Sequence, residues 1–357
     1  MKTICITGAA GYVGAMLVLQ LSQRDDIGAI VGIDKEPLPD LLKDVTKLSW
    51  IQANLSENSW QEQVRAHTPT IIIHTAWQIR EMYGKKKMQW KWNVEGSEAV
   101  FRFAFETPGI ERLIHFSTAS SYGAYTTNTL SHFFKEEEGF RDEEYLYAVE
   151  KKAAEEKLHA LYQEKKDNAV LPQVFVVRPA AITGPRGRFM RVRFGLQSAL
   201  SGQLKGSFIH RLVSLLVSWV PATPLWCRQF IHEDDVTDIV EMLACAPQAG
   251  RYEVFNITPP GNPVLAHEMA EVVGKKILPV SPWMVRIAFF FFWHVTQGRI
   301  PTSRGGWRFY SYPIVMDGSK ITSMCGYTYR YGSADAFRYT DGRYESYVPE
   351  ALRRHKV

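Results

Sequence analysis

Two side chains of this chain, Tyr147 and Lys151, are spaced for acid–base chemistry. They are four residues apart in the segment EEYLYAVEKKAAEEKLHALYQEKK, whose composition predicts a helix. Because residues four apart lie on the same helical face, the phenol and the ammonium group are expected to be neighbours. A nearby cation favours the phenolate and lowers the pKa of Tyr147, so that this residue could act as a general acid or base near neutral pH. The same pair on a charged helix is also typical of ordinary surface residues, so its assignment depends on the rest of the chain.

Hydroxyl side chains gather just upstream, at the end of a predicted strand. The strand-like run RLIHF is followed by Ser117, Thr118, Ser120 and Ser121 before a Tyr-Gly pair. Ligands of open α/β sheets bind at the carboxyl ends of the parallel strands. We therefore expect these hydroxyl groups to lie at a binding site near Tyr147.

The first fifteen residues predict where a dinucleotide would bind. The motif TGAAGYVG follows the strand-like run KTICI and opens a helical stretch. Gly8 would allow a tight turn, Gly11 would let the backbone approach a pyrophosphate, and Gly14 would let the helix lie close to the strand. The chain is therefore expected to begin with a nucleotide-binding βαβ unit.

The second predicted strand, AIVGID, ends on Asp34, twenty residues after Gly14. At this spacing a carboxylate meets the ribose hydroxyls of the adenosine and disfavours the extra phosphate of NADP. Lys35 beside it could tolerate such a phosphate. We expect NAD as the cofactor, with NADP as the disfavoured alternative.

The order of elements predicts an α/β fold with a Rossmann-type, doubly wound parallel sheet. Strand-like runs alternate with helical segments along the first half of the chain: KTICI, AIVGID, LSWIQAN, TIIIHTA, RLIHFST and QVFVVRP. After about residue 180 the elements become shorter and richer in Gly, Pro and aromatic residues. We expect an NAD-binding domain over residues 1–180 and a smaller, mainly substrate-binding lobe over residues 181–357 that is interleaved with it.

Composition excludes several other classes of protein. The net charge is +5, but the 42 Lys and Arg residues are scattered along the chain, which does not indicate nucleic-acid binding. The four cysteines form no CxxC pair and are interpreted as reduced thiols, and no signal peptide is apparent before the first strand. We expect a cytoplasmic protein.

The run His232 to Asp235 is contiguous and is not expected to converge on one ion, so no metal site is predicted.

With these motifs in place, the chain resembles an extended short-chain dehydrogenase/reductase. This family of NAD-dependent epimerases and dehydratases includes nucleotide-sugar enzymes and 3β-hydroxysteroid dehydrogenases. The resemblance covers nearly the whole chain and is carried by the glycine loop, HTA, WNVEG, STASSYG, YAVEK, RPAAITGP and RQFIHEDDV. It implies that Tyr147 exchanges a proton with the substrate hydroxyl and that Lys151 also holds the nicotinamide ribose. It further implies that Thr118 bonds the same hydroxyl, with Ser117 and Ser120 as alternatives.

The resemblance also implies the remaining binding residues and a homodimer formed through the helices that bear Asn93 and Tyr147. The residues implied for the cofactor are Tyr12 and Val13 at the pyrophosphate, Asn54 and Leu55 at the adenine, Ala76 and Asn93 at the strand edge along the dinucleotide, and Pro179. Arg228 matches a position that contacts a diphosphate in sugar-nucleotide members, although it also occurs in members with other substrates. Asn54 and Glu150 depart from the family, which often has an acid and a Ser at these positions.

Three functions remain open at this stage. The first is a nucleotide-sugar epimerase or dehydratase that works through a transient keto intermediate, with Tyr147 as the acid and base. The second is an NAD(P)-dependent oxidoreductase of a sterol-like or other apolar secondary alcohol. The third is a non-catalytic dinucleotide-binding regulator, which is disfavoured because such relatives typically lose the tyrosine and the lysine that are present here.

Two apolar segments, residues 212–226 and 283–295, carry what substrate information the second half contains. Each is shorter than the roughly 20 residues needed to cross a bilayer. We expect a pair of buried helices that close the substrate lobe. The alternative is a lipid-facing lid or peripheral membrane contact, with Arg286, His294 and Arg299 at headgroup level. The basic and aromatic run KKKMQWKW, residues 85–92, is interpreted as a solvated helix face or a subunit contact.

Overall fold

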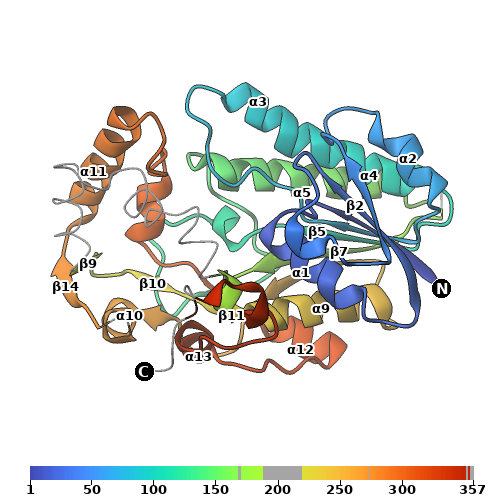
Figure 1. Cartoon of the computed structure of the whole chain (residues 1–357). Coiled ribbons are helices and arrows are strands. Elements are labelled where there is room, and N and C mark those ends of the chain that lie inside the picture. The colour runs from blue at the N-terminus through green and yellow to red at the C-terminus, as the bar shows by residue number, and fades with distance from the viewer. Residues whose placement is uncertain (168–169, 188–218, 273, 351–352, 354–357) are drawn as a thin grey trace.

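A computed structural model describes residues 1–167, 170–187, 219–272, 274–350 and 353. Its centre is a seven-stranded parallel sheet in the order β12-β7-β5-β4-β1-β2-β3 (Figure 1). The strands are β1 (Lys2–Thr7), β2 (Ile27–Asp34), β3 (Leu48–Gln52), β4 (Ile71–His74), β5 (Arg112–Phe116), β7 (Gln173–Pro179) and β12 (Tyr252–Ile257). The order reverses between β1 and β4, which is the arrangement of a doubly wound sheet. The predicted fold class is confirmed.

Helices cover both faces of the sheet, as Figure 1 shows. On one face lie α1 (Tyr12–Leu21), α9 (Glu233–Cys245) and α12 (Ser319–Cys325), and on the other lie α2 (Trp60–Ala66), α4 (Gly96–Glu106) and α5 (Leu146–Lys165). Alternate residues of β1 enter the two cores, with Ile4 and Ile6 on the α1 side and Cys5 on the α4 side. Because both faces are covered, the inner strands β1, β4 and β5 carry consecutive buried residues instead of an alternation of buried and exposed ones.

The helix before α4 is not regular. A π-helical turn, η2 (Lys91–Glu95), joins helix α3 (Lys86–Trp90) to α4 and contains Asn93. A π-helical turn inside an α-helix shifts the side chains that follow it and is frequent at functional sites. Here it turns Asn93 inward, where the residue is 2% exposed.

The second half of the chain is built from short elements. Four two-stranded pairings join β8 (Ala181–Thr183) to β11 (Phe230–His232), β9 (Trp219–Ala222) to β14 (Lys276–Pro279), β10 (Cys227–Arg228) to β13 (Val264–Leu265), and β6 (Phe133–Phe134) to β15 (Val315–Met316). The helical elements here are α10 (Ala266–Val272), α11 (Pro282–Val295), α13 (Ser333–Arg338) and the 3-10 turns η5 (Gly306–Tyr310) and η6 (Glu345–Tyr347). Helix α9 and strand β12 pack with the central sheet. Residues after 230 therefore belong partly to the sheet region and partly to the region of short elements.

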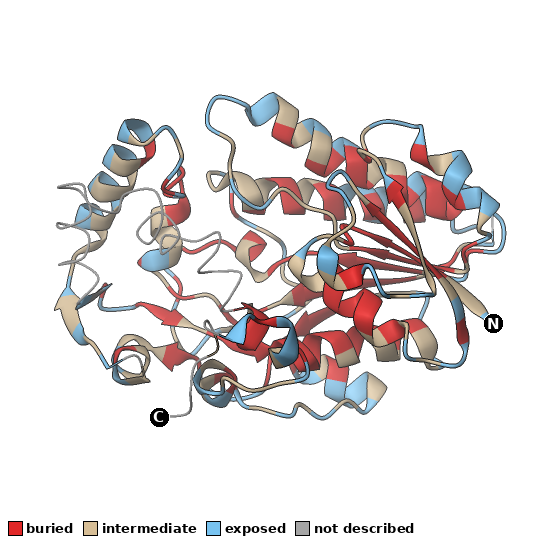
Figure 2. Cartoon of the chain, viewed as in Figure 1, coloured by how far each residue is buried: buried red, intermediate tan, exposed pale blue. Residues whose placement is uncertain are grey.

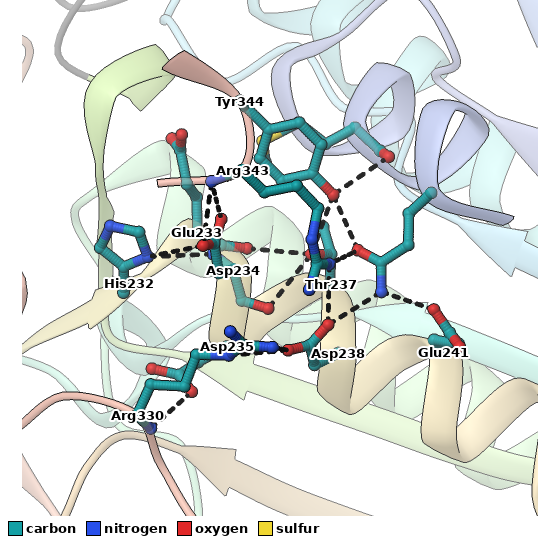
Figure 3. A network of polar contacts seen from close by, with 12 residues as sticks. His232, Glu233, Asp234, Asp235, Thr237, Asp238, Glu241, Arg330, Arg343 and Tyr344 are labelled. Atoms are coloured by element: carbon teal, nitrogen blue, oxygen red, sulfur yellow. Dashed lines mark hydrogen bonds and ion pairs between the residues drawn. The ribbon is translucent and has the colours of Figure 1, made fainter. Parts of the chain in front are cut away.

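A polar network fastens the C-terminal segment to α9 (Figure 3). Asp238 accepts two hydrogen bonds from Arg330, the longer of which comes from Nε at 3.0 Å. It also accepts one from Nη1 of Arg343 at 2.8 Å. Asp234 accepts from the backbone N–H of Arg343 at 3.1 Å, and Tyr344 donates to Gln20 of α1 at 2.8 Å. The acidic side chains of α9 therefore bind the C-terminal segment to this helix.

The expectation of two buried helices is wrong for the described residues. Trp219–Ala222 is a strand, whereas Leu212–Ser218 lies outside the described residues. Residues 282–295 do form helix α11, but of its fourteen residues, all described, only Trp293 is buried (Figure 2). The helix stands at the end of the molecule far from the central sheet, and the described residues cover only part of it (Figure 1). No helix in the described part of the chain is long and apolar enough to cross a membrane.

Candidate active site

The glycine loop is built around backbone contacts that leave no room for side chains. Gly8 has a φ of 72°, and a Cβ atom there would lie 2.5 Å from Cα of Ala76. A Cβ atom on Gly14 would overlap the carbonyl oxygen of Gly8. The loop and the first turn of α1 therefore touch each other and the end of β4, as a cradle for a dinucleotide requires.

The first turn of α1 lies next to this loop. Gly11 caps the helix without a side-chain hydrogen bond, and the positive end of the helix dipole at Tyr12 and Val13 favours an anion. The Tyr12 hydroxyl donates to Glu233, which also accepts from the backbone N–H of Gly187 at 2.8 Å. Burial raises the pKa of Glu233 to about 7. Tyr12 thereby links the loop to α9.

Asp34 lies at the end of β2, beside the glycine loop. Its carboxylate accepts from the N–H of Ala10 at 3.0 Å and from the N–H of Glu36 at 3.0 Å. Burial raises the pKa of this carboxyl, and the two backbone hydrogen bonds oppose the shift. The Lys35 ammonium group lies 4.3 Å from the ring centroid of Trp92. The arrangement fits the ribose of NAD.

The two residues expected at the adenine differ in character. The Asn54 Oδ1 atom accepts from the N–H and the hydroxyl of Ser56, at 3.1 and 3.0 Å. Leu55 is 8% exposed and belongs to the core between the sheet and α4. Asn54 thus stabilises its own turn, a role that the family's usual acid could also fill.

The expected catalytic residues meet at the carboxyl end of β5. Thr118 follows this strand, and its hydroxyl lies within hydrogen-bonding reach of the half-buried Tyr147 phenol. The Thr118 oxygen also accepts from the N–H of Ser120 at 3.1 Å, which fixes its rotamer. Lys151, 3% exposed, donates to the carbonyl oxygen of Phe116 at 2.5 Å. The hydroxyl, the phenol and the ammonium group therefore share one site.

The expected lowering of the Tyr147 pKa is not found. Burial raises the pKa of Tyr147, and the hydrogen bond with Thr118 only partly opposes this. Lys151 is itself held well below its usual pKa by burial, with Glu155 and Glu150 acting in the opposite direction. Its ammonium group points to Phe116 and lies 3.6 Å from the ring centroid of Trp77. Desolvation therefore outweighs the helical pairing of the two side chains.

Behind this site, Asn93 is held by a buried carboxylate. Its amide nitrogen donates to Glu150 at 2.7 Å, and its amide oxygen accepts from the N–H of Gln78 at 2.7 Å. Gln89 also donates to the same carboxylate oxygen of Glu150, at 3.1 Å. Burial raises the pKa of Glu150 to about 7. The departure from the family's usual Ser thus supplies an acceptor that fixes the side chain of Asn93.

The Glu150→Gln variant is expected to change how stability depends on pH. The carboxyl ionises at an ordinary value of 4.5 when unfolded and about 7 when folded, so the unfolded chain binds fewer protons between these values. The contribution of Glu150 to stability is therefore present below pH 4.5 and lost as the pH rises through 7. When the pH rises from below 4.5 to above 7, the free energy of unfolding should therefore fall by about 2–4 kcal/mol less in the variant than in the parent chain.

Urea unfolding at several pH values measures this difference. The matched control is Glu156→Gln, an exposed position on the same helix, which should follow the parent chain. Parallel curves for Glu150→Gln and the parent chain would show that Glu150 ionises normally in the fold.

Arg228, which was expected at the substrate, lies near Tyr145, whose ring packs beside that of Tyr147. Arg228 ends strand β10, is half-buried, and contributes a positive charge to the surroundings of Tyr145. The Tyr145 ring lies 5.8 Å from that of Tyr147 and 4.8 Å from that of Phe309 in η5, as measured between centroids. Pro179 ends β7 at the same edge of the sheet. The lobe thus brings a basic and an aromatic surface toward the phenol.

Sequence reasoning missed three residues of this site: Trp77 under Lys151, Gln89 on Glu150, and Tyr145 beside Tyr147. Trp77 directly follows the HTA motif, and Tyr145 lies two residues before Tyr147. Their positions in the sequence could therefore have indicated that both lie near the site. Gln89 had none, because its contact depends on how α3 packs against α5.

The comparisons with known proteins now decide the family. A sequence profile described as "NAD dependent epimerase/dehydratase family" matches residues 4–258. The chain belongs to this family. The expected resemblance to extended short-chain enzymes is thereby confirmed, as is the expectation of an enzyme that uses NAD.

Individual relatives of this epimerase/dehydratase are distant in sequence. UDP-D-apiose/UDP-D-xylose synthase 1 of Arabidopsis thaliana is 22% identical over 307 residues, which cover 78% of this chain and 76% of the synthase. The enzyme WbmG of Bordetella bronchiseptica, solved in complex with NAD, matches with a TM-score of 0.64 and 22% identity over 94% of this chain and 91% of its own. MoeE5, solved with UDP-glucuronic acid and NAD, matches with a TM-score of 0.64 and 22% identity over 95% of this chain and 97% of its own. At these identities the two solved structures establish the shared fold.

Proposed function

We propose that this epimerase/dehydratase acts on a nucleotide sugar, with Tyr147 as the acid and base. The observation that carries the proposal is the meeting of Thr118, Tyr147 and Lys151 at the end of β5, beside the glycine loop. Thr118 and Tyr147 would both hydrogen-bond one substrate hydroxyl, so that Tyr147 takes its proton as the carbon is oxidised. Bound NAD is the acceptor of the hydride in this chemistry.

The residues around the loop fit that cofactor. Gly8 and Gly14 let the loop, α1 and the end of β4 approach closely, and the N-terminal end of α1 would favour the pyrophosphate. Asp34 would accept from the adenosine ribose. Lys151 would hold the nicotinamide ribose through an ammonium group that is buried beside Phe116.

Which substrate reacts depends on the groups that the second half of the chain presents beside Tyr147. Arg228 is the basic residue that would contact the diphosphate of the substrate, as a guanidinium group commonly does through paired hydrogen bonds. The comparisons support a nucleotide sugar, because MoeE5 was solved with UDP-glucuronic acid and the Arabidopsis relative is named for UDP-sugars. After oxidation, return of the hydride to the opposite face of the keto carbon would give an epimer, whereas loss of water followed by return of the hydride would give a dehydrated product. In neither case does reduced cofactor accumulate.

A thermal-shift titration tests the class of substrate. With NAD present, UDP should raise the melting temperature in a saturable manner, since a ligand that binds only the folded state stabilises it. Arg228→Ala should weaken UDP binding about 10–100-fold, because a hydrogen bond to a charged group contributes about 1.5–3 kcal/mol. The control Arg251→Ala removes an exposed arginine elsewhere and should leave binding unchanged. Stabilisation by a hydroxysterol but not by UDP would contradict the proposal.

A second candidate, the oxidation of an apolar secondary alcohol, is favoured by one observation. The aromatic residues Phe289, Phe309 and Tyr310 connect α11 to Tyr145 through ring contacts of 4.8–5.2 Å between centroids. An apolar substrate could lie along this surface. The proposal of a homodimer through the helices that bear Asn93 and Tyr147, in the cytoplasm, applies to either function.

A further inference from the structure

Helix α11 presents an apolar face that no described part of the chain covers. Six large apolar side chains on it are 45–69% exposed: Trp283, Met284, Ile287, Phe290, Phe291 and Val295. At about 100° per residue they fall within an arc of roughly 140° on one side of the helix. The opposite side carries Phe289, which packs against Tyr310, and the buried Trp293. Solvent-exposed apolar surface of this extent marks an interaction site.

The charges around this face have one sign. Residues 272–316 contain no Asp or Glu but six basic residues: Lys275, Lys276, Arg286, Arg299, Arg304 and Arg308. Within the described residues, only Arg308 of these six forms an ion pair, with Glu144 at 3.5 Å. Arg286, Arg299 and Arg304 are exposed. Five of these six cations near the apolar face therefore form no ion pair within the part of the chain that the structure describes.

A second basic segment joins this rim from another part of the chain. Tyr83 packs against Trp293 with 5.5 Å between ring centroids, and its hydroxyl lies 3.1 Å from Nδ1 of His294. This contact places the exposed residues Lys85, Lys86 and Lys87 near the C-terminal end of α11. Only Lys86 forms an ion pair among the described residues, with Glu81 at 3.4 Å.

We propose that α11 docks this protein onto an anionic lipid surface. A helix of fourteen residues is too short to cross a bilayer, but it can lie in the interface with one apolar face among the acyl chains. The aromatic side chains Trp283 and Tyr83 and the flanking arginines and lysines match the depth at which rings and cations meet lipid headgroups. A second copy of the chain fits less well, because a two-fold contact would bring the same cations together. The inference does not depend on the proposed substrate.

Co-sedimentation of the full-length protein with lipid vesicles tests this docking. The protein should bind vesicles of equal parts phosphatidylcholine and phosphatidylglycerol, bind vesicles of phosphatidylcholine alone weakly, and dissociate at high salt. The double variant Phe290→Ser/Phe291→Ser should weaken binding at least about tenfold, because two exposed rings would no longer enter the lipid. The control Met324→Ser, at an apolar position on α12 that is 41% exposed, should bind like the parent chain.

A second variant keeps the test independent of folding. Arg286→Glu/Arg299→Glu changes only exposed charges and should also weaken binding to the anionic vesicles at least about tenfold. Binding that neither double variant changes, or no binding at all, would overturn the proposal. It would also be overturned if the Phe variant melted several degrees lower, which would show that the chain covers this face itself. Dissociation of a dimer by the Phe variant, without vesicle binding, would assign the face to a second copy instead.

Discussion

Replacing Tyr147 by Phe is expected to lower kcat by about 10²–10⁴, the usual contribution of a positioned acid or base. The phenol is the group beside Thr118 that can exchange a proton with a substrate hydroxyl, and Phe keeps the ring while removing the oxygen. The affinity for NAD should change less than about threefold, because the glycine loop, Asp34 and Lys151 are untouched. Steady-state turnover and NAD titration by calorimetry measure the two quantities separately.

Tyr162→Phe is the matched control for this variant. Tyr162 lies on the same helix, is 9% exposed, and packs against Phe105 and Tyr252, away from Thr118. It should retain full turnover. A Tyr147→Phe protein that keeps most of its activity would refute the assigned role.

The second large effect is expected from Gly14→Ala. The added Cβ atom would overlap the carbonyl oxygen of Gly8, so either α1 or the loop must move. The strain should cost about 1–3 kcal/mol of stability, as overpacking commonly does. NAD binding should weaken at least about 100-fold, because the N–H groups of the first turn would no longer face the pyrophosphate.

Gly139→Ala provides the comparison for this substitution. Gly139 is exposed, and a Cβ atom there would meet nothing within 4 Å. This variant should bind NAD like the parent chain and melt at nearly the same temperature. An unchanged NAD affinity in Gly14→Ala would place the pyrophosphate elsewhere.

The parts of the fold that could be predicted from sequence are those determined by local patterns. The six predicted strands are present as β1 to β5 and β7, because a buried parallel strand must be apolar throughout. The glycine loop was equally predictable, since Gly8 and Gly14 occupy positions where only a residue without Cβ fits. The same holds for the helix that carries Tyr147 and Lys151.

What could not be predicted depends on contacts between distant segments. Glu150 and Asn93 are 57 residues apart, and only the packing of α5 against the π-helical turn reveals their hydrogen bond. The raised pKa of Tyr147 follows from burial, which the spacing of Tyr147 and Lys151 does not encode. For α11, an apolar sequence suggested a buried helix, whereas the tertiary fold leaves one side of it exposed.

The most direct test of the central claim follows the fate of both substrate and cofactor. The purified protein would be incubated with NAD and a panel of UDP-sugars and hydroxysterols, while nicotinamide absorbance is recorded and products are separated by chromatography. The proposed function predicts that a UDP-sugar is converted to an isomer or a dehydrated product without accumulation of reduced nicotinamide, and that Tyr147→Phe abolishes this conversion. Reduced nicotinamide that accumulates in step with a ketone from an apolar alcohol, with the UDP-sugars unchanged, would contradict it.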